Sequence, residues 1–116
     1  MCLAVLEWRP GQAIPLRAVA NRDEDRQRPT LALAPWPGTQ LVGGRDLQAG
    51  GSWLAFDGRA RFALLTNLRS PGPITGKRSR GELVARYLLG SQPATVYASD
   101  VAAQRGQYGP FNLLLG

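Results

Sequence analysis

The sequence contains no histidine, only one cysteine and only one lysine, and these shortages exclude several classes of function. Without histidine the chain cannot carry a serine–histidine–aspartate triad or a histidine-ligated metal site. A single cysteine, Cys2, rules out a disulfide within the chain, which is typical of a reducing compartment, so we expect a cytoplasmic protein. No apolar run approaches the roughly 18 residues of a membrane span, and no basic start followed by an apolar core and a cleavage site indicates export. We therefore predict no transmembrane segment.

The net charge is strongly positive, at +6 for 116 residues. Thirteen of the fourteen basic residues are arginine, and they are scattered from Arg9 to Arg105. The basic cluster at residues 77–80 has no interleaved aromatic side chains on which bases could stack. We therefore interpret the arginines as a solvated surface, expect no nucleic-acid partner, and leave anionic partners open on ordinary electrostatic grounds.

Short apolar runs bounded by Pro, Gly or polar residues predict strands, because helices need longer patterns. The expected strands are residues 2–8, 15–21, 53–56, 61–67 and 111–116. The first two should pair in antiparallel fashion across a Pro-Gly turn, and Asp57-Gly58 is a strong hairpin signal between the next two. We expect irregular loops at residues 23–38, which hold three prolines, and at 68–78. The glycine pairs at 43–44 and 50–51 predict tight turns with positive φ.

Two helices are predicted in the last third of the chain. Ser79 with Glu82 three residues later resembles a capping box, and Gly90 is placed to end the first helix. The second helix is expected at about residues 93–104, with proline early in its first turn. Strand hairpins followed by helices and a returning strand predict an α+β fold, with antiparallel sheet layers packed against helices. We expect one domain over residues 1–116, truncated at the C-terminus because its last residues are an apolar strand without a polar tail.

Polar and ionisable residues gather where two of the predicted strands end. Asn21-Arg22-Asp23-Glu24 follows the second strand directly, and Asn67 ends the fourth. A rigid strand delivers such side chains to the edge of a sheet, although Asp23 and Asn67 could also simply cap solvated turns. Cys2 lies where removal of Met1 would make it the N-terminus, and a small buried strand residue is the alternative interpretation.

Six short motifs occur in an order that resembles a known family. They are Met1-Cys2-Leu3, Ala20-Asn21-Arg22-Asp23-Glu24 with Arg28-Pro29-Thr30, Gly44-Arg45-Asp46 with Gly50-Gly51-Ser52-Trp53-Leu54, Leu65-Thr66-Asn67, Ser79-Arg80-Gly81-Glu82-Leu83 and Phe111-Asn112-Leu113. Together they resemble the NRDE family, also called the transport and Golgi organisation protein 2 family. Ser52 stands where threonine is common in the family, and residues 25–27 depart from the aromatic-containing spacing often seen before Arg28.

The resemblance implies a fold similar to the N-terminal-nucleophile hydrolases, an αββα sandwich whose enzymes use the first residue as nucleophile. A thiol is mostly protonated at neutral pH and needs a nearby base, which a free α-amine with a pKa near 8 can supply. Cys2, exposed by loss of Met1, would then attack an amide carbonyl. Asp23 would orient the amine with support from Asn21, and Asn67 would donate to the developing oxyanion.

Two further details follow from the resemblance. Arg22 would bind an acidic group of the substrate, or would simply pair with Glu24 or Asp46. The spacing of Asn21 and Asp23 after the second strand also resembles the cysteine amidases of the choloylglycine-hydrolase type. We expect this chemistry to need no cofactor.

Three functions remain open on the sequence alone. The first is a cysteine amidohydrolase acting on a small-molecule amide. The second is a non-catalytic carrier or trafficking factor for a hydrophobic ligand, because members of the resembled family have been linked to Golgi organisation, secretion, and haem or lipid handling. The third is a structural or interaction domain, which would show a large exposed apolar patch in place of a pocket.

Overall fold

The computed structural model describes residues 2–68 and 76–116, which contain seven strands and two α-helices. Two strands, β1 (Leu3–Trp8) and β2 (Leu16–Asn21), form a hairpin of their own. The others form one sheet in the order β3 (Thr30–Pro35), β4 (Val42–Asp46), β5 (Leu54–Phe56), β6 (Phe62–Asn67) and β7 (Phe111–Leu115). Between β6 and β7 in the chain come α1 (Glu82–Leu89), α2 (Ala94–Ala103) and a short 3₁₀-helix, η1 (Arg105–Gln107). All the paired strands are antiparallel.

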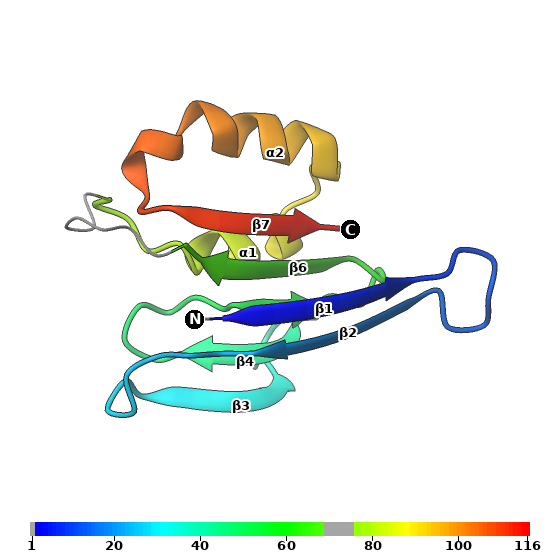
Figure 1. The fold of residues 1–116 in the computed structure, drawn as a ribbon, viewed down its shortest axis with the longest axis horizontal. Coiled ribbons are helices and arrows are strands. Elements are labelled where there is room, and N and C mark those ends of the chain that lie inside the picture. The colour runs from blue at the N-terminus through cyan, green and yellow to red at the C-terminus, as the bar shows by residue number, and fades with distance from the viewer. Residues whose placement is uncertain (1, 69–75) are drawn as a thin grey trace.

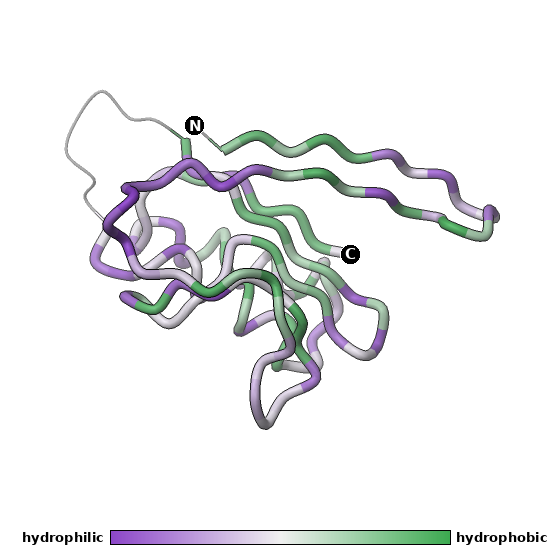
Figure 2. The backbone as a smooth tube through the Cα atoms, turned by 90° about the horizontal axis from the view of Figure 1, so that it is seen from below, coloured by the Kyte–Doolittle hydropathy of each residue, from purple (hydrophilic) through white to green (hydrophobic). Residues whose placement is uncertain are grey.

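The β1–β2 hairpin and the helices lie on opposite faces of the five-stranded sheet (Figure 1). Seen from below in Figure 2, the hairpin runs along one side of the sheet, and its turn extends beyond the rest of the chain. Two antiparallel sheets packed with helices confirm the predicted α+β class. The finer likeness to N-terminal-nucleophile hydrolases stays a prediction. In the two described ranges no helix is long and apolar enough to cross a membrane.

The core lies between the five-stranded sheet and α1. Apolar side chains recur at helical spacing on one face of α1, and all of them are buried: Leu83, Val84, Tyr87 and Leu88. They belong to one cluster with Ala55 of β5 and with Ala63 and Leu65 of β6. Trp36 is also buried, and its indole Nε1 donates a hydrogen bond to the carbonyl oxygen of Gly43 at 3.1 Å.

All five predicted strands are confirmed, with small shifts of their ends. In the β1–β2 hairpin the register runs from Leu3 opposite Asn21 to Trp8 opposite Leu16. The turn at Asp57 joins β5 to β6, as the Asp-Gly signal predicted. Both helices are also confirmed, and the main-chain N–H of Gly90 ends α1 by donating to the carbonyl oxygen of Arg86.

Two predictions about loops are wrong. Part of the expected irregular loop forms β3, an edge strand, where the final Pro35 is tolerated because few main-chain donors are needed. The glycines at 43–44 do not form a turn but lie within β4. A Cβ at Gly43 would lie 2.6 Å from the Cβ of Ala55 on β5, so close packing of two strands requires glycine there. The second glycine pair does turn the chain, with a φ of 75° at Gly50.

The predicted capping box is also wrong. The N-cap of α1 is Gly81, and no side chain caps the helix. The carboxylate of Glu82 instead accepts a hydrogen bond from the Tyr108 hydroxyl at 2.7 Å and pairs with Arg78, because β7 and its preceding turn pack beside the helix start. Most of the loop expected at 68–78 lies outside the described residues, as does Met1.

Candidate functional site

Cys2 lies at the start of β1, where the hairpin brings the beginning of the chain against the end of β2. The main-chain N–H of Leu3 donates to Oδ1 of Asn21 at 2.9 Å. Cys2 is half-buried, and its Sγ lies 3.9 Å from the main-chain carbonyl oxygen of Asp23. The structure therefore brings Cys2, Asn21 and Asp23 together. The loss of Met1, on which the predicted nucleophile depends, concerns a residue outside the described part of the chain.

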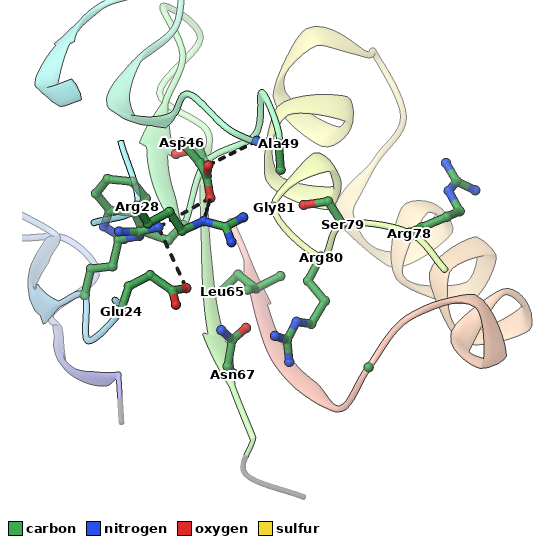
Figure 3. A pocket seen from close by; sticks show the side chains of 14 residues that line it. Glu24, Arg28, Asp46, Ala49, Leu65, Asn67, Arg78, Ser79, Arg80 and Gly81 are labelled. Atoms are coloured by element: carbon green, nitrogen blue, oxygen red, sulfur yellow. Dashed lines mark hydrogen bonds and ion pairs between the residues drawn. The ribbon is translucent and has the colours of Figure 1, made fainter. Parts of the chain in front are cut away.

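Asn67 reaches the same end of the molecule from β6, whose arrow points toward the start of β1 in Figure 1. It lines a cavity of about 200 Å³ together with Arg22 and Glu24. In Figure 3, Glu24 and Arg80 lie on either side of Asn67. Cys2 is not among the residues that line this cavity, but it contacts Asp23, whose chain neighbours Arg22 and Glu24 do line it. Burial lowers the pKa of Arg80, and the nearby negative charge of Glu24 opposes this shift.

The cavity is lined mainly by charged and polar side chains. Its charged residues are four arginines and two carboxylates, which leave an excess of positive charge: Arg22, Arg28, Arg78, Arg80, Glu24 and Asp46. Ser52, Asn67 and Ser79 add uncharged polar groups. Such a surface suits a small polar or anionic ligand better than an apolar one.

Asp46, at the end of β4, holds two of these arginines in place. Its Oδ2 accepts from Nε of Arg28 at 2.7 Å and from Nη2 of Arg22 at 3.3 Å. Its Oδ1 accepts from the main-chain N–H groups of Gln48 and Ala49. Burial alone would raise the pKa of Asp46, but these hydrogen bonds, with that of Arg28 foremost, hold the pKa below its ordinary value of 3.8. Asp46 is therefore a charged anchor for the cavity wall.

Arg22 takes up one of the two roles that the sequence allowed. It pairs with Asp46, lies 3.8 Å from Oε2 of Glu24, and stacks with its guanidinium carbon 4.6 Å from the centre of the Trp53 ring. These contacts fix the guanidinium at the cavity wall. Binding of an acidic substrate group by Arg22 stays a prediction.

The basic cluster at residues 77–80 is not the solvated surface that we expected, because Arg78 and Arg80 are half-buried and line the cavity. In Figure 3 the Arg80 side chain points toward Asn67, whereas that of Arg78 points away from it. Arg78 pairs with Glu82 and donates to Oε1 of Gln107 at 3.0 Å. The segment before α1 packs closely against the backbone of residues 51–52. The N–H of Ser52 donates to the carbonyl oxygen of Gly81 at 3.0 Å, and a Cβ at Gly51 would lie 2.6 Å from that oxygen.

In residues 2–68 and 76–116, no three His, Cys, Asp or Glu side chains are grouped closely enough to hold a metal ion. The groups that the site offers are a thiol, amide and carboxylate groups, and arginines. These residues come from the ends of β1, β2, β4 and β6 and from the segment before α1.

The geometry defines an α+β protein with a cysteine directly before its first strand and an arginine-rich cavity lined by residues that follow its second strand. Residues 1–116 match the family described as Transport and Golgi organisation 2, and the chain belongs to this family, as its motifs predicted.

Curated relatives agree with this assignment. The chain is 34% identical over 122 residues to the Transport and Golgi organization protein 2 homolog of Bos taurus. It is 31% identical over 122 residues to the homolog of Homo sapiens, and 30% identical over 122 residues to that of Mus musculus. Each match covers 98% of this chain and 44% of the relative, so the chain spans less than half the length of these relatives.

Proposed function

We propose that this chain supplies the nucleophile of a cysteine amidohydrolase that cleaves a C–N amide bond. The observation that carries the proposal is the position of Cys2. Its half-buried thiol lies 3.9 Å from the main-chain carbonyl oxygen of Asp23, and the chain neighbours of Asp23, Arg22 and Glu24, line a polar cavity. A thiol at the first residue of a processed chain has its own α-amine as a base. The reducing cytoplasm, where we place the protein, suits a reactive free thiol.

The reaction follows from these groups. After loss of Met1, the α-amine of Cys2 takes the thiol proton, and Sγ attacks the carbonyl carbon of the amide. The tetrahedral intermediate carries its negative charge on oxygen, toward which the Asn67 amide donates. The C–N bond then breaks, the amine leaves with the proton, and water hydrolyses the thioester to release the acid and restore the thiol.

Asn21 and Asp23 act as positioning residues in this proposal. Asn21 ties the first residue of β1 to the end of β2 through its hydrogen bond from Leu3, which fixes the main chain on which Cys2 is carried. Asp23 follows directly, and its role is to orient the α-amine toward Sγ. The rigid hairpin thus sets the distance between nucleophile and base before any substrate binds.

The test measures the state and reactivity of Cys2 in the purified full-length protein. Intact mass should show that Met1 is absent. Iodoacetamide should label the Cys2 peptide rapidly, and Asp23→Asn should slow the labelling by about tenfold or more while the protein stays folded. The matched control is Asp25→Asn, which removes the same charge from an exposed residue two positions further on and should leave the rate unchanged.

Two results would overturn the amidohydrolase proposal. One is a retained Met1, because Cys2 would then have no free amine. The other is an equal labelling rate in the wild type, Asp23→Asn and Asp25→Asn. A panel of N-acyl compounds is worth screening for turnover only if both results are absent, and Cys2→Ser should then abolish hydrolysis.

A non-catalytic carrier is the second candidate function, and an apolar groove favours it. The groove, of about 230 Å³, lies between α2 and β7 and is lined by Val101, Phe111, Leu113 and Leu115 among others. The names of the curated relatives also refer to transport and Golgi organization. A carrier should bind a fluorescent fatty-acid probe, lose the probe when Ala98→Trp fills the groove, and keep it in Cys2→Ser. Equal binding by all three proteins would contradict a ligand in this groove.

A further inference from the structure

The positive charges of the cavity are matched by carboxylates with one exception. Arg22 and Arg28 both pair with Asp46, and Arg22 also lies near Glu24. Arg78 pairs with Glu82 at the start of α1. Within the described ranges, Arg80 is the cavity arginine with no carboxylate oxygen within 4.0 Å of its guanidinium nitrogens.

Arg80 is held in the cavity wall by a single hydrogen bond. Its Nη1 donates to the carbonyl oxygen of Pro110 at 2.9 Å, which leaves the other N–H groups of the guanidinium without an acceptor among the described residues. The side chain is half-buried, and this burial lowers the pKa of Arg80 although the charges of Glu24 and Cys2 oppose the shift. A half-buried guanidinium that no carboxylate contacts directly is compensated only in part by the more distant charge of Glu24, so an anion bound to it would be stabilising.

Two neutral polar groups face the same space. In the part of the chain that the structure describes, neither the Asn67 amide nor the Ser79 hydroxyl has a side-chain hydrogen-bond partner, although both line the cavity. An amide N–H and a hydroxyl are donors that suit the oxygens of an anion already bound to a guanidinium. The planar fork of Arg80 matches a carboxylate or phosphate group, which takes two parallel hydrogen bonds.

We propose that Arg80 and Ser79, with one of the two N–H groups of the Asn67 amide, form a subsite that binds an anionic oxygen group of the ligand, a carboxylate or a phosphate, and that the other Asn67 N–H stays available for the oxyanion. Anion binding at this subsite does not depend on the proposed amidohydrolase function. Only the statement that the bound ligand is an amide rests on that function. For that function, the subsite narrows the substrate class to amides that carry a negatively charged group next to the scissile bond. Arg80 and Asn67 share the cavity with Arg22 and Glu24, the chain neighbours of the residue that Cys2 contacts, so we expect a bound anion to hold the neighbouring carbonyl on the Cys2 side of the cavity.

The subsite is tested by binding in the Cys2→Ser protein, so that turnover plays no part. Three small probes separate the chemistry: N-acetylglycine with a carboxylate, inorganic phosphate, and the uncharged N-acetylglycinamide. We expect the two anions to shift the amide NMR signals of residues 79–81 and 67, and the uncharged amide to leave them in place. Whichever anion binds more tightly identifies the preferred group.

Four variants assign the binding to Arg80. Arg80→Gln should weaken anion binding by about tenfold or more, because a charge-assisted pair of hydrogen bonds is lost. Its matched control, Arg26→Gln, removes the same charge from an exposed loop outside the cavity and should change binding little. Ser79→Asp should abolish binding, because it supplies an internal carboxylate to Arg80. Ser79→Asn, which has the shape of the aspartate variant without its charge, should retain binding. The Ser79 pair leaves Arg80 in place and tests the proposal even if Arg80→Gln does not fold.

The proposal is overturned if N-acetylglycinamide binds as tightly as N-acetylglycine, if Arg80→Gln and Arg26→Gln weaken binding equally, or if Ser79→Asp binds anions like the wild type. These outcomes leave the amidohydrolase proposal standing, because labelling of Cys2 in the protein with its thiol decides that question separately. Conversely, an inert Cys2 with intact anion binding would keep the subsite and remove only the amide chemistry.

Discussion

Two hairpins of this chain hold the same set of charges and use them differently. In the β1–β2 hairpin, Glu7 pairs with Arg9 and with Arg17, at 2.6 and 2.7 Å. In the β5–β6 hairpin, Asp57 pairs with Arg59 and with Arg61, at 3.1 and 2.8 Å. The Glu7 side chain is 39% exposed, whereas that of Asp57 is 1% exposed. The chemical groups are alike, so the difference comes from what lies around them.

Helix α1 lies behind the second hairpin and accounts for the difference. Oδ1 of Asp57 accepts from the main-chain N–H groups of Arg59 and Arg61 at 2.8 and 3.0 Å. Both arginines also donate hydrogen bonds to the main-chain carbonyl oxygens of Leu88 and Gly90, which lack main-chain partners among the described residues because α1 ends there. Asp57 thereby joins a turn to a helix end, while the pairs of Glu7 stay within one exposed hairpin.

The apolar residues of the two hairpins differ in the same way. Val5 and Val19 face each other on the outward side of β1–β2 and are 62% and 74% exposed. Ala63 and Leu65 of β6 are buried in the core. The first hairpin therefore adds little to the core that the structure describes, and its contribution to the candidate site is to carry Cys2 and Asn21 to the cavity.

The largest predicted effect concerns the apolar residues of the two hairpins, which are buried in β5–β6 and exposed in β1–β2. Leu65→Ala, at a core position 6% exposed, should lower the free energy of unfolding by about 3 kcal/mol, because it removes buried methyl groups and leaves a cavity. Val19→Ala, on the exposed face, should change it by less than about 0.5 kcal/mol. Urea denaturation of both variants measures the difference. A loss at Val19 that equals the loss at Leu65 would mean that the outward face of the hairpin is covered in the protein.

The second prediction concerns the buried carboxylate of the β5–β6 hairpin, Asp57. Asp57→Ala removes a buried carboxylate, so the arginines lose their anion and two main-chain N–H groups lose their acceptor. We expect a loss of about 2 kcal/mol in the free energy of unfolding, below the usual cost of breaking a buried pair because Arg59 is 49% exposed and can be solvated. Equal urea midpoints for Asp57→Ala and wild type would contradict an anchoring role for this carboxylate.

Acid unfolding tests the same carboxylate by its pH dependence. Burial acts to raise the pKa of Asp57, but the hydrogen bonds from Arg61 and Arg59 outweigh it and hold the pKa below 3.8. A depressed folded pKa means that the unfolded chain binds the proton first, so the stabilisation is complete above the unfolded pKa and is lost as the pH falls through the folded one. Below about pH 4, wild type should therefore lose stability more steeply with falling pH than Asp57→Asn.

The β5–β6 hairpin was predictable from the sequence because its signals are local. Asp57-Gly58 marks the turn, and the apolar run from Phe62 to Leu65 marks the buried strand. Strands β3 and β4 were not predictable in this way. Prolines and glycines usually break strands, and only the partner strand shows why they are tolerated: Gly43 packs against Ala55, and β3 lies at the sheet edge.

The candidate site was predictable in part for the same reason. The polar residues after β2 and at the end of β6 follow strands directly, so alternation and strand ends pointed to Asn21, Asp23 and Asn67. The role of Arg80 was not predictable, because residues 77–80 look like any solvated basic run. Its burial depends on the long-range contact between Ser52 and Gly81, which no local pattern encodes.

The smallest predicted effect concerns the exposed carboxylate of the β1–β2 hairpin, Glu7. Glu7→Gln keeps the shape of the side chain and removes its charge, so the ion pairs with Arg9 and Arg17 are lost. Because all three side chains are well exposed, we expect a change of about 0.3 kcal/mol in the free energy of unfolding, which high ionic strength should remove. Urea denaturation at low and high salt measures it, with Asp57→Asn treated identically as the buried counterpart. A salt-independent loss at Glu7 as large as that at Asp57 would show that burial is not what separates the two hairpins, since the charges and partners are otherwise matched.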